Sequence, residues 1–162
     1  MKELLEYREK LIARYAEATK EFCKACESFF ANPFEKIEGD WNLHQVAAHL
    51  RDIEKLVYAE RIRETLQGGN PHFKSFDPDV WMAQQYDKDE PLNKILLDFD
   101  SDVTELCHLL KNLGREDWSR LSSHESAGNE MTLQVWVERG LAHIEEHLQN
   151  LKKQGKPKEL LT

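Results

Sequence analysis

Histidines at two places in the chain have the spacing of ligands for a divalent metal ion. His143 and His147 are four residues apart, so on a helix they lie one turn apart on the same face. His49 falls within the apolar stripe of another predicted helix, which contains Val46, Ile53, Leu56 and Val57. Three imidazoles that face one interior leave an open coordination position, an arrangement typical of catalytic zinc. Zinc or nickel is the favoured ion, with iron or manganese as further candidates.

A structural explanation for these histidines stands beside the metal. A single inward histidine is ordinarily a core residue whose ring nitrogens find partners within the protein. Three inward rings are harder to satisfy in this way, because each buried nitrogen without a partner costs about 1–3 kcal/mol. The other four histidines are expected elsewhere: His44 on the helix face opposite His49, His108 outside an apolar stripe, and His72 and His124 in loops.

Residues 143–147 read His-Ile-Glu-Glu-His and therefore also fit the H-x-x-E-H motif of inverted zinc proteases. Those enzymes take a third, carboxylate ligand from far downstream, and 15 residues follow His147, so we expect no protease. Glu146 lies one turn from His143 and is the candidate general base. Its side chain is directed away from the apolar centre of the helix, so the alternative is a solvent-exposed acid.

Three other features have both a chemical and a structural interpretation. Cys23 and Cys26 form a C-x-x-C pair, but they come late in a helix rather than at its N-terminus, where a thiolate is stabilised. We therefore expect Cys26 to pack in the core. Arg8, near an open end of the first helix, would either attract an acidic substrate or lay its aliphatic stem along the core. Trp81 and Tyr86 would either cover the metal cavity or pack the link that contains them.

Four long stretches with helical periodicity lie between short clusters of glycine and proline. They run from Leu4 to Phe30, from Leu43 to Gln67, from Pro91 to just before Gly114, and from just after Thr132 to just before Gly155. The first would bury the stripe Leu4, Leu11, Tyr15, Ala18, Phe22, Cys26 and Phe29. Asn42 and Gln45 form a predicted capping box, and Thr132 is a predicted N-cap. No segment alternates long enough to predict a strand. The predicted fold class is therefore all-α, a four-helix bundle in one domain over residues 1–162.

The link between the second and third helices, from Gly68 to Glu90, is long enough to cross the bundle and includes a short helical stretch at residues 78–86. His49 lies about 9 Å into its helix, and His147 lies about 10 Å from the end of the last helix, at 1.5 Å per residue. The rings therefore meet at one height only if these two helices are antiparallel. In a plain up-down-up-down bundle they would miss by about 13 Å. The spacing thus favours an up-down-down-up topology with a long crossover.

Several segments resemble the DinB-like superfamily in their order and spacing. Residues 41–50, Trp-Asn-Leu-His-Gln-Val-Ala-Ala-His-Leu, resemble its signature at the second helix. Residues 123–128, 131–133 and 143–149 resemble its last loop and last helix. The likeness extends from about Leu4 to Leu151. Members often carry Asp directly after the first histidine of the last pair, where this chain has Ile144.

The resemblance implies an up-down-down-up bundle and a divalent ion held by His49, His143 and His147. Related proteins are metal-dependent hydrolases or thiol-dependent S-transferases, which implies a small-molecule substrate and, for the transferases, a low-molecular-weight thiol. An ion in such a site acts as a Lewis acid toward water, thiol or substrate. The alternative is a non-catalytic metal-binding module, or a helical module for interaction or dimerisation.

The composition restricts the partners. The chain has 162 residues, with 30 acidic and 22 basic side chains and a formal net charge of −8, so it would repel a phosphate backbone. No apolar run reaches the roughly 18 residues of a membrane span, and the first residues lack the apolar segment of a signal peptide. The three cysteines indicate reduced thiols. We expect a cytoplasmic protein that binds neither nucleic acid nor membrane, and that pairs as a homodimer through outer helix faces.

Overall fold

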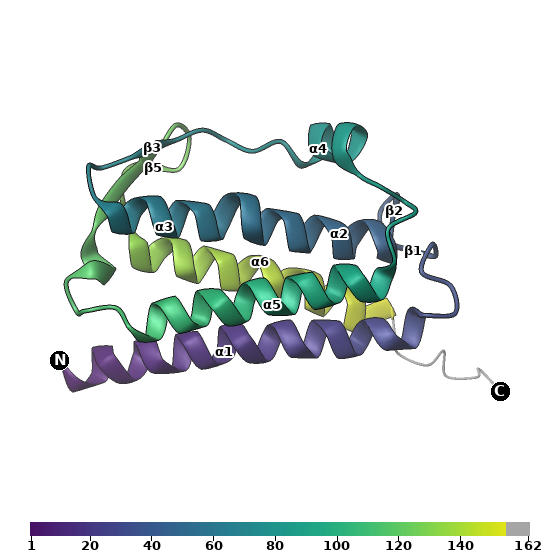
Figure 1. Ribbon diagram of the computed structural model, residues 1–162, viewed down its shortest axis with the longest axis horizontal. Helices are drawn as coiled ribbons and strands as arrows, with labels where there is room; N and C mark the ends of the chain where they lie inside the picture. The colour runs from purple at the N-terminus through teal and green to yellow at the C-terminus, as the bar shows by residue number, and fades with distance from the viewer. Residues whose placement is uncertain (155–162) are drawn as a thin grey trace.

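Four long helical segments lie side by side in the computed structural model, which describes residues 1–154 (Figure 1). The first is α1 (Lys2–Cys26), and the last two are α5 (Leu92–Lys111) and α6 (Leu133–Gln154). The second consists of α2 (Leu43–Ile53), the π-helical segment η2 (Glu54–Ala59) and α3 (Glu60–Gln67). The second segment and α5 run opposite to α1 and α6, which confirms the up-down-down-up bundle (Figure 1).

The helix ends follow the capping residues closely. The Asn42 side chain accepts a hydrogen bond from the Gln45 amide, and the Gln45 side chain accepts one from the Asn42 amide, so the predicted capping box is confirmed. The Thr132 hydroxyl accepts a hydrogen bond from the Val135 amide at 3.2 Å, as expected of an N-cap. Pro91 lies just outside the helix that it was predicted to begin, and α5 starts at Leu92. The first helix ends in a 3₁₀ turn, η1 (Glu27–Phe29).

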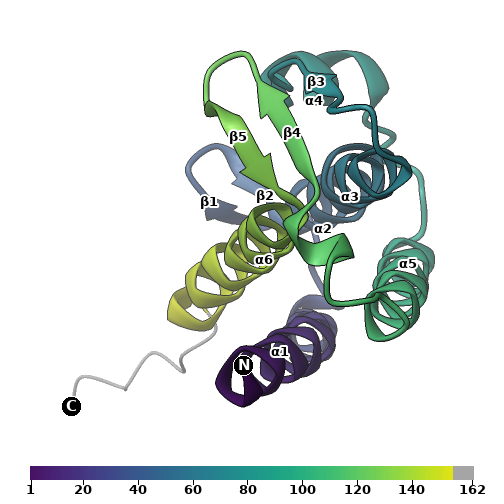
Figure 2. The ribbon, with the colours of Figure 1, turned by 90° about the vertical axis from the view of Figure 1, so that its left-hand side faces the viewer.

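The fold is mainly helical, as predicted, but the connections contain short strands that no sequence pattern indicated. A hairpin of β1 (Lys36–Glu38) and β2 (Trp41–Asn42) precedes α2. A second sheet has the order β3-β4-β5, with β3 (His72–Phe73) parallel to β4 (Leu121–His124), and β4 antiparallel to β5 (Gly128–Thr132). This sheet lies at the end of the bundle where α6 begins (Figure 2). Strands of two to five residues are too short for a period-2 pattern to be recognised.

The crossover between α3 and α5 passes over the outside of α2 and α3 (Figure 1). It contains the predicted short helix, α4 (Pro78–Gln85), which Asp77 caps through the amides of Asp79 and Val80. His44 is buried under the far end of this link, with Nδ1 2.6 Å from the Tyr86 hydroxyl and Nε2 2.6 Å from the Glu90 carbonyl. These two contacts attach the last part of the link, residues 86–90, to the start of α2. A short 3₁₀ turn, η3 (Asp117–Ser119), follows α5.

The π-helical segment changes which side chains of the second helix enter the core. A π turn takes in about one extra residue, so the face that points inward shifts along the sequence. Glu54 is consequently buried at 1% exposure, whereas Leu56, predicted to lie in the apolar stripe, is 52% exposed. Leu4 was also wrongly assigned to a buried stripe, because it lies in the first turn of α1, at the end of the bundle.

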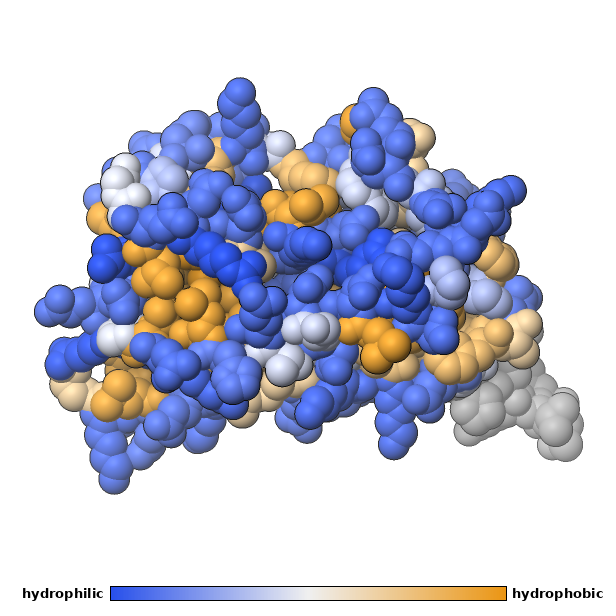
Figure 3. Space-filling view, in the orientation of Figure 1, coloured by the Kyte–Doolittle hydropathy of each residue, from blue (hydrophilic) through white to orange (hydrophobic). Residues whose placement is uncertain are grey.

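Hydrophilic residues cover most of the face seen in Figure 3.

Glu54 forms the polar centre of the core together with Tyr15. The Tyr15 hydroxyl donates to the two carboxylate oxygens of Glu54, at 2.7 Å each, and joins α1 to η2. Gly140 on α6 packs directly against Tyr15, since a Cβ at that position would overlap the Tyr15 hydroxyl. A glycine inside a long helix is therefore explained by the close approach of α1.

Candidate metal centre

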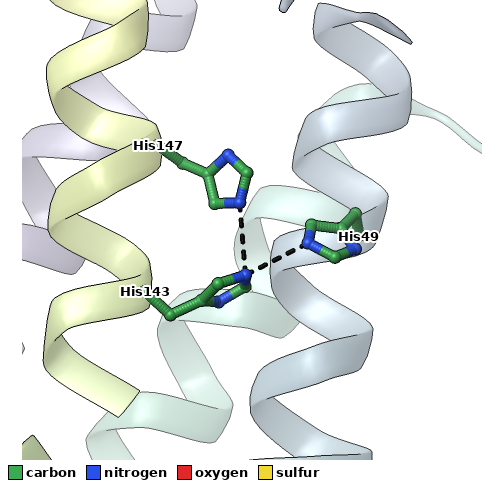
Figure 4. A group of neighbouring side chains, drawn as sticks. All are labelled: His49, His143 and His147. Atoms are coloured by element: carbon green, nitrogen blue, oxygen red, sulfur yellow. Dashed lines mark hydrogen bonds between the residues drawn. The ribbon is translucent and has the colours of Figure 1, made fainter. Parts of the chain in front are cut away.

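The structure brings together the three histidines that the sequence selected (Figure 4). His49 comes from α2, and His143 and His147 come from successive turns of the antiparallel α6. The Nε2 atom of His143 is 3.1 Å from Nε2 of His49 and 3.2 Å from Nε2 of His147. One ligand nitrogen from each ring lies within 4.8 Å of the other two. Three ring nitrogens thus converge on one small region between two helices.

A carboxylate missed by the sequence analysis orients His147. Glu38, on strand β1, has its two oxygens 2.8 and 2.9 Å from Nδ1 of His147. An ionised carboxylate only accepts hydrogen bonds, so Nδ1 of His147 is the donor to Glu38, and Nε2 is the ring nitrogen that faces the cluster. Burial opposes ionisation of Glu38, but the interactions with His147, Asn150 and His49 together outweigh it and lower the pKa of Glu38. Asn150 also donates to Glu38, at 3.1 Å.

Aromatic side chains enclose His49. Its ring centroid is 4.9 Å from that of Trp41 and 6.2 Å from that of Trp81. Trp81 on α4 is buried and packs beside His49, but it is absent from the cavity wall, so covering the cavity stays a prediction. Tyr86 packs the link that contains it, because it binds His44 instead. Among residues 1–154, Nδ1 of His49 is a buried nitrogen without a hydrogen-bond partner.

Burial keeps the proton off two of the rings. It lowers the pKa of His143 from 6.5 to about 3 and that of His49 to about 4, and the neighbouring His147 contributes to both shifts. Both rings are neutral at physiological pH, which is the form that binds a metal ion.

The donor set fits a divalent ion of the size of zinc or nickel. A tetrahedral site with metal–nitrogen bonds of about 2.0–2.1 Å has ligand nitrogens about 3.3 Å apart, close to the two observed separations. The carboxylate behind His147 is also typical, since metal-binding histidines usually donate their other ring N–H to such a group. The three histidines therefore fit a set of metal ligands, and Glu38 orients one of them.

A cavity of about 290 Å³ opens beside the cluster. His49 and His143 form part of its wall. The remaining polar groups of the wall come from η2, α3, β4, α6 and two loops, and most were not selected from the sequence: Tyr58, Arg61, Ser75, His124, Ser126 and Arg139. Tyr58 lies beside His143, with ring centroids 5.6 Å apart and ring planes tilted by 42°.

His124 was expected in a loop but lies on β4, where it is buried. Its Nδ1 accepts hydrogen bonds from the backbone amides of Ser126 and Ala127, at 3.1 Å each. The sheet that the sequence analysis missed thus supplies one histidine to the wall of the cavity, outside the three-histidine cluster.

The other candidate residues lie away from the cavity. Glu146 is exposed and is absent from the cavity wall. Its position therefore matches the alternative prediction, a solvent-exposed acid, rather than a general base. Cys26 is buried in the core as predicted, and burial raises the pKa of Cys23 to about 12. Arg8 is buried at the end of α1, where its Nε donates to Gln134 at 2.9 Å.

The chain is similar to known proteins in family and in fold. The model of the DinB superfamily matches residues 3–151. A solved structure, YfiT from Bacillus subtilis, superimposes with a TM-score of 0.82 at 20% sequence identity, covering 91% of this chain and 85% of that one. YfiT is described as a probable metal-dependent hydrolase with an unusual four-helix bundle topology. A search of curated proteins found no match.

Within residues 1–154, no helix combines the length and the apolar character needed to cross a bilayer. The family match spans nearly the whole described chain, and the bundle has the topology expected of the family. The chain belongs to the DinB superfamily.

Proposed function

We propose that this protein is a metal-dependent hydrolase that uses His49, His143 and His147 to hold a zinc or nickel ion. The observation that carries the proposal is the convergence of the three Nε2 atoms at the edge of a cavity. The description of YfiT as a probable metal-dependent hydrolase supports it, because that protein shares the fold. Three protein ligands leave a position open for water or substrate.

The residues around the cluster have separate tasks. Glu38 fixes the ring of His147, and the packing of Trp41 and Trp81 holds His49 and limits the access of water. The bound ion would supply Lewis acidity, which lowers the pKa of a coordinated water molecule and polarises a substrate bond. Burial raises the pKa of Tyr58, so its hydroxyl stays protonated beside His143 and is placed to donate a hydrogen bond to a substrate oxygen.

A thiol S-transferase is the second candidate function. The same open position accepts a thiolate, because thiols bind zinc and nickel in the deprotonated form. The cysteines of this chain are remote from the cavity wall, so the thiol would be a small co-substrate rather than a side chain. The proposed partners are therefore a small molecule and, for transfer, a low-molecular-weight thiol. A cytoplasmic location and a homodimer remain predictions.

Metal analysis followed by a substrate screen tests the proposal. Tag-free protein, purified without added metal, should contain close to one zinc or nickel ion per chain, and His49→Ala should contain less than about 0.1. His108→Ala is the matched control, because His108 is exposed on α5 and should leave the metal content unchanged. An iron or manganese content that depends on His49 would support the site and correct the ion.

The metal-loaded protein is then assayed with esters and amides, and with electrophiles in the presence of small thiols. Hydrolysis that is lost with His49→Ala supports the hydrolase, and thiol-dependent turnover supports the transferase. A bound ion with no metal-dependent turnover in either screen would favour a non-catalytic metal-binding module. The absence of an ion from both the wild type and the control would remove the site.

A further inference from the structure

Two arginines line the cavity beside the histidine cluster and have no acidic partner among residues 1–154. Arg61 comes from α3, and Arg139 comes from α6, one turn before His143. Four residues of helix correspond to about 6 Å along the axis, so Arg139, His143 and His147 follow one another along the same face. Neither arginine forms an ion pair within the part of the chain that the structure describes.

The indole ring of Trp136 holds both guanidinium groups near the cavity. The central carbon of Arg61 lies 4.7 Å from the ring centroid, and that of Arg139 lies 5.8 Å from it. Such contacts orient a guanidinium group while its N–H groups remain available. One N–H of Arg61 is used, since Nη2 donates to the Lys74 carbonyl at 3.0 Å. The remaining donors of Arg61 have no hydrogen-bond acceptor among residues 1–154.

Within residues 1–154, no carboxylate belongs to the cavity wall to neutralise these cations. Two acids of neighbouring segments have other partners than the arginines. Glu125 accepts from the backbone amide of the wall residue Ser75 at 2.6 Å, and Glu138 accepts from the Tyr7 hydroxyl. Burial lowers the pKa of Arg61, and the charge of Arg139 contributes, although a guanidinium stays charged at neutral pH. A local positive region thus adjoins the histidines in a chain whose formal net charge is −8.

We propose that Arg61 and Arg139 bind an oxyanion group of the substrate, a carboxylate or a phosphate, and so place the rest of the substrate at the histidine cluster. Arginine is well suited to this task, because its planar N–H groups match the oxygens of either group. The cavity volume of about 290 Å³ is at the lower end of the range for small-molecule sites, which indicates a compact substrate. This substrate class extends the proposed function, but the arginine site itself requires no metal.

The indole N–H signals of the four tryptophans report where an anion binds. Protein labelled with ¹⁵N at tryptophan and freed of metal by dialysis is titrated with propionate, propionamide and inorganic phosphate. Trp136, against both arginines, should shift, whereas Trp118, which lies beside Arg8 away from this cavity, should stay unchanged. We expect at least one of the two anions to bind about 10-fold or more tightly than the neutral amide. The tighter anion identifies the group.

Charge removal at the two arginines should weaken the binding. Arg61→Met and Arg139→Met are each expected to reduce anion affinity about 10-fold or more, and Arg61→Lys less than Arg61→Met. Arg63→Met is the matched control: it removes the same charge from α3, but Arg63 is absent from the cavity wall and lies near Glu105. Arg139 is exposed, so its variant keeps the test valid if Arg61→Met does not fold.

The inference is overturned if the amide binds as tightly as both anions, if Arg63→Met weakens binding as much as the other two variants, or if only Trp118 shifts. None of these results would bear on the proposed metal site, because the metal content is measured separately. Conversely, a chain that binds no metal but shows arginine-dependent anion binding would refute the proposed function and retain the anion site. A repeat of the titration with the metal-loaded protein shows whether the two sites act on the same ligand.

Discussion

Glu54 is a buried acid whose titration should make the protein less stable as the pH rises. Its side chain is 1% exposed, and its hydrogen bonds come from Tyr15. Burial raises the pKa of Glu54 from 4.5 to about 7, and the hydrogen bonds from Tyr15 offset only part of that rise. The carboxyl group is therefore protonated in the folded protein at pH 5 and ionised well above pH 7.

The sign and size of the effect follow from this pKa difference. Between pH 4.5 and about 7 the folded state holds a proton that the unfolded chain has released, so the free energy of unfolding falls as the pH rises. The whole shift is worth about 3 kcal/mol at about 1.4 kcal/mol per pKa unit. Part of the loss is complete by pH 5, which leaves about 2–3 kcal/mol between pH 5 and pH 8.5.

Urea unfolding of the metal-free protein, followed by circular dichroism from pH 5 to pH 8.5, measures this loss. Glu54→Gln keeps the size of the side chain but does not ionise, so its stability relative to the wild type should improve by about 2–3 kcal/mol across that range. The lowered pKa values of His49 and His143 affect both proteins alike and cancel in the difference. The control Glu105→Gln alters an exposed carboxylate and should show no such trend. A difference between Glu54→Gln and wild type that stays constant within about 0.5 kcal/mol would refute the reasoning.

Three further predictions concern the site, the helix packing and the thiols. Glu38→Gln removes the charged acceptor behind His147, so metal affinity, measured by competition with a chromophoric chelator, should fall about 10- to 100-fold. Equal affinities would exclude an orienting role, and Glu35→Gln in the same connection is the control. Gly140→Ala should lower the free energy of unfolding by about 1–3 kcal/mol in urea, because its Cβ overlaps the Tyr15 hydroxyl, although alanine favours helix by about 1 kcal/mol. A more stable Gly140→Ala variant would contradict the packing. Burial raises the pKa of all three thiols, Cys23, Cys26 and Cys107. They should therefore react slowly with a disulfide reagent at pH 8 in the folded protein and quickly in urea. Fast labelling of the folded protein would show instead that the thiols are accessible.

The helices and their topology could be predicted because their signals are local and repeated. The apolar residues recur over many turns, and caps such as Asn42 mark where a helix begins. The direction of the helices followed from one geometric requirement, that His49 and His147 lie at the same height. The short strands carry no comparable pattern, since β1 and β3 have only three and two residues. The π-helical segment was missed for a related reason, because helical periodicity assumes a constant 3.6 residues per turn.

Only those residues of the site could be predicted whose spacing on a single helix indicates which way they face. The pair His143 and His147 shares a face, and His49 lies in an apolar stripe, so all three could be selected. Glu38 lies on a short strand 109 residues before His147, and no local pattern connects the two. Arg61 and Arg139 are charged residues on helices, which ordinarily face solvent. Their position became evident only when α3 and α6 were seen to share a cavity.

The most direct measurement of the central claim is anomalous scattering from crystals grown without added metal, with data collected on both sides of the absorption edges of zinc and nickel. One peak per chain should lie about 2.0–2.1 Å from Nε2 of each of His49, His143 and His147, with Nδ1 of His147 still bound to Glu38. Crystals in which the three rings contact one another with no peak between them, or in which the ion lies elsewhere in the chain, would contradict the claim.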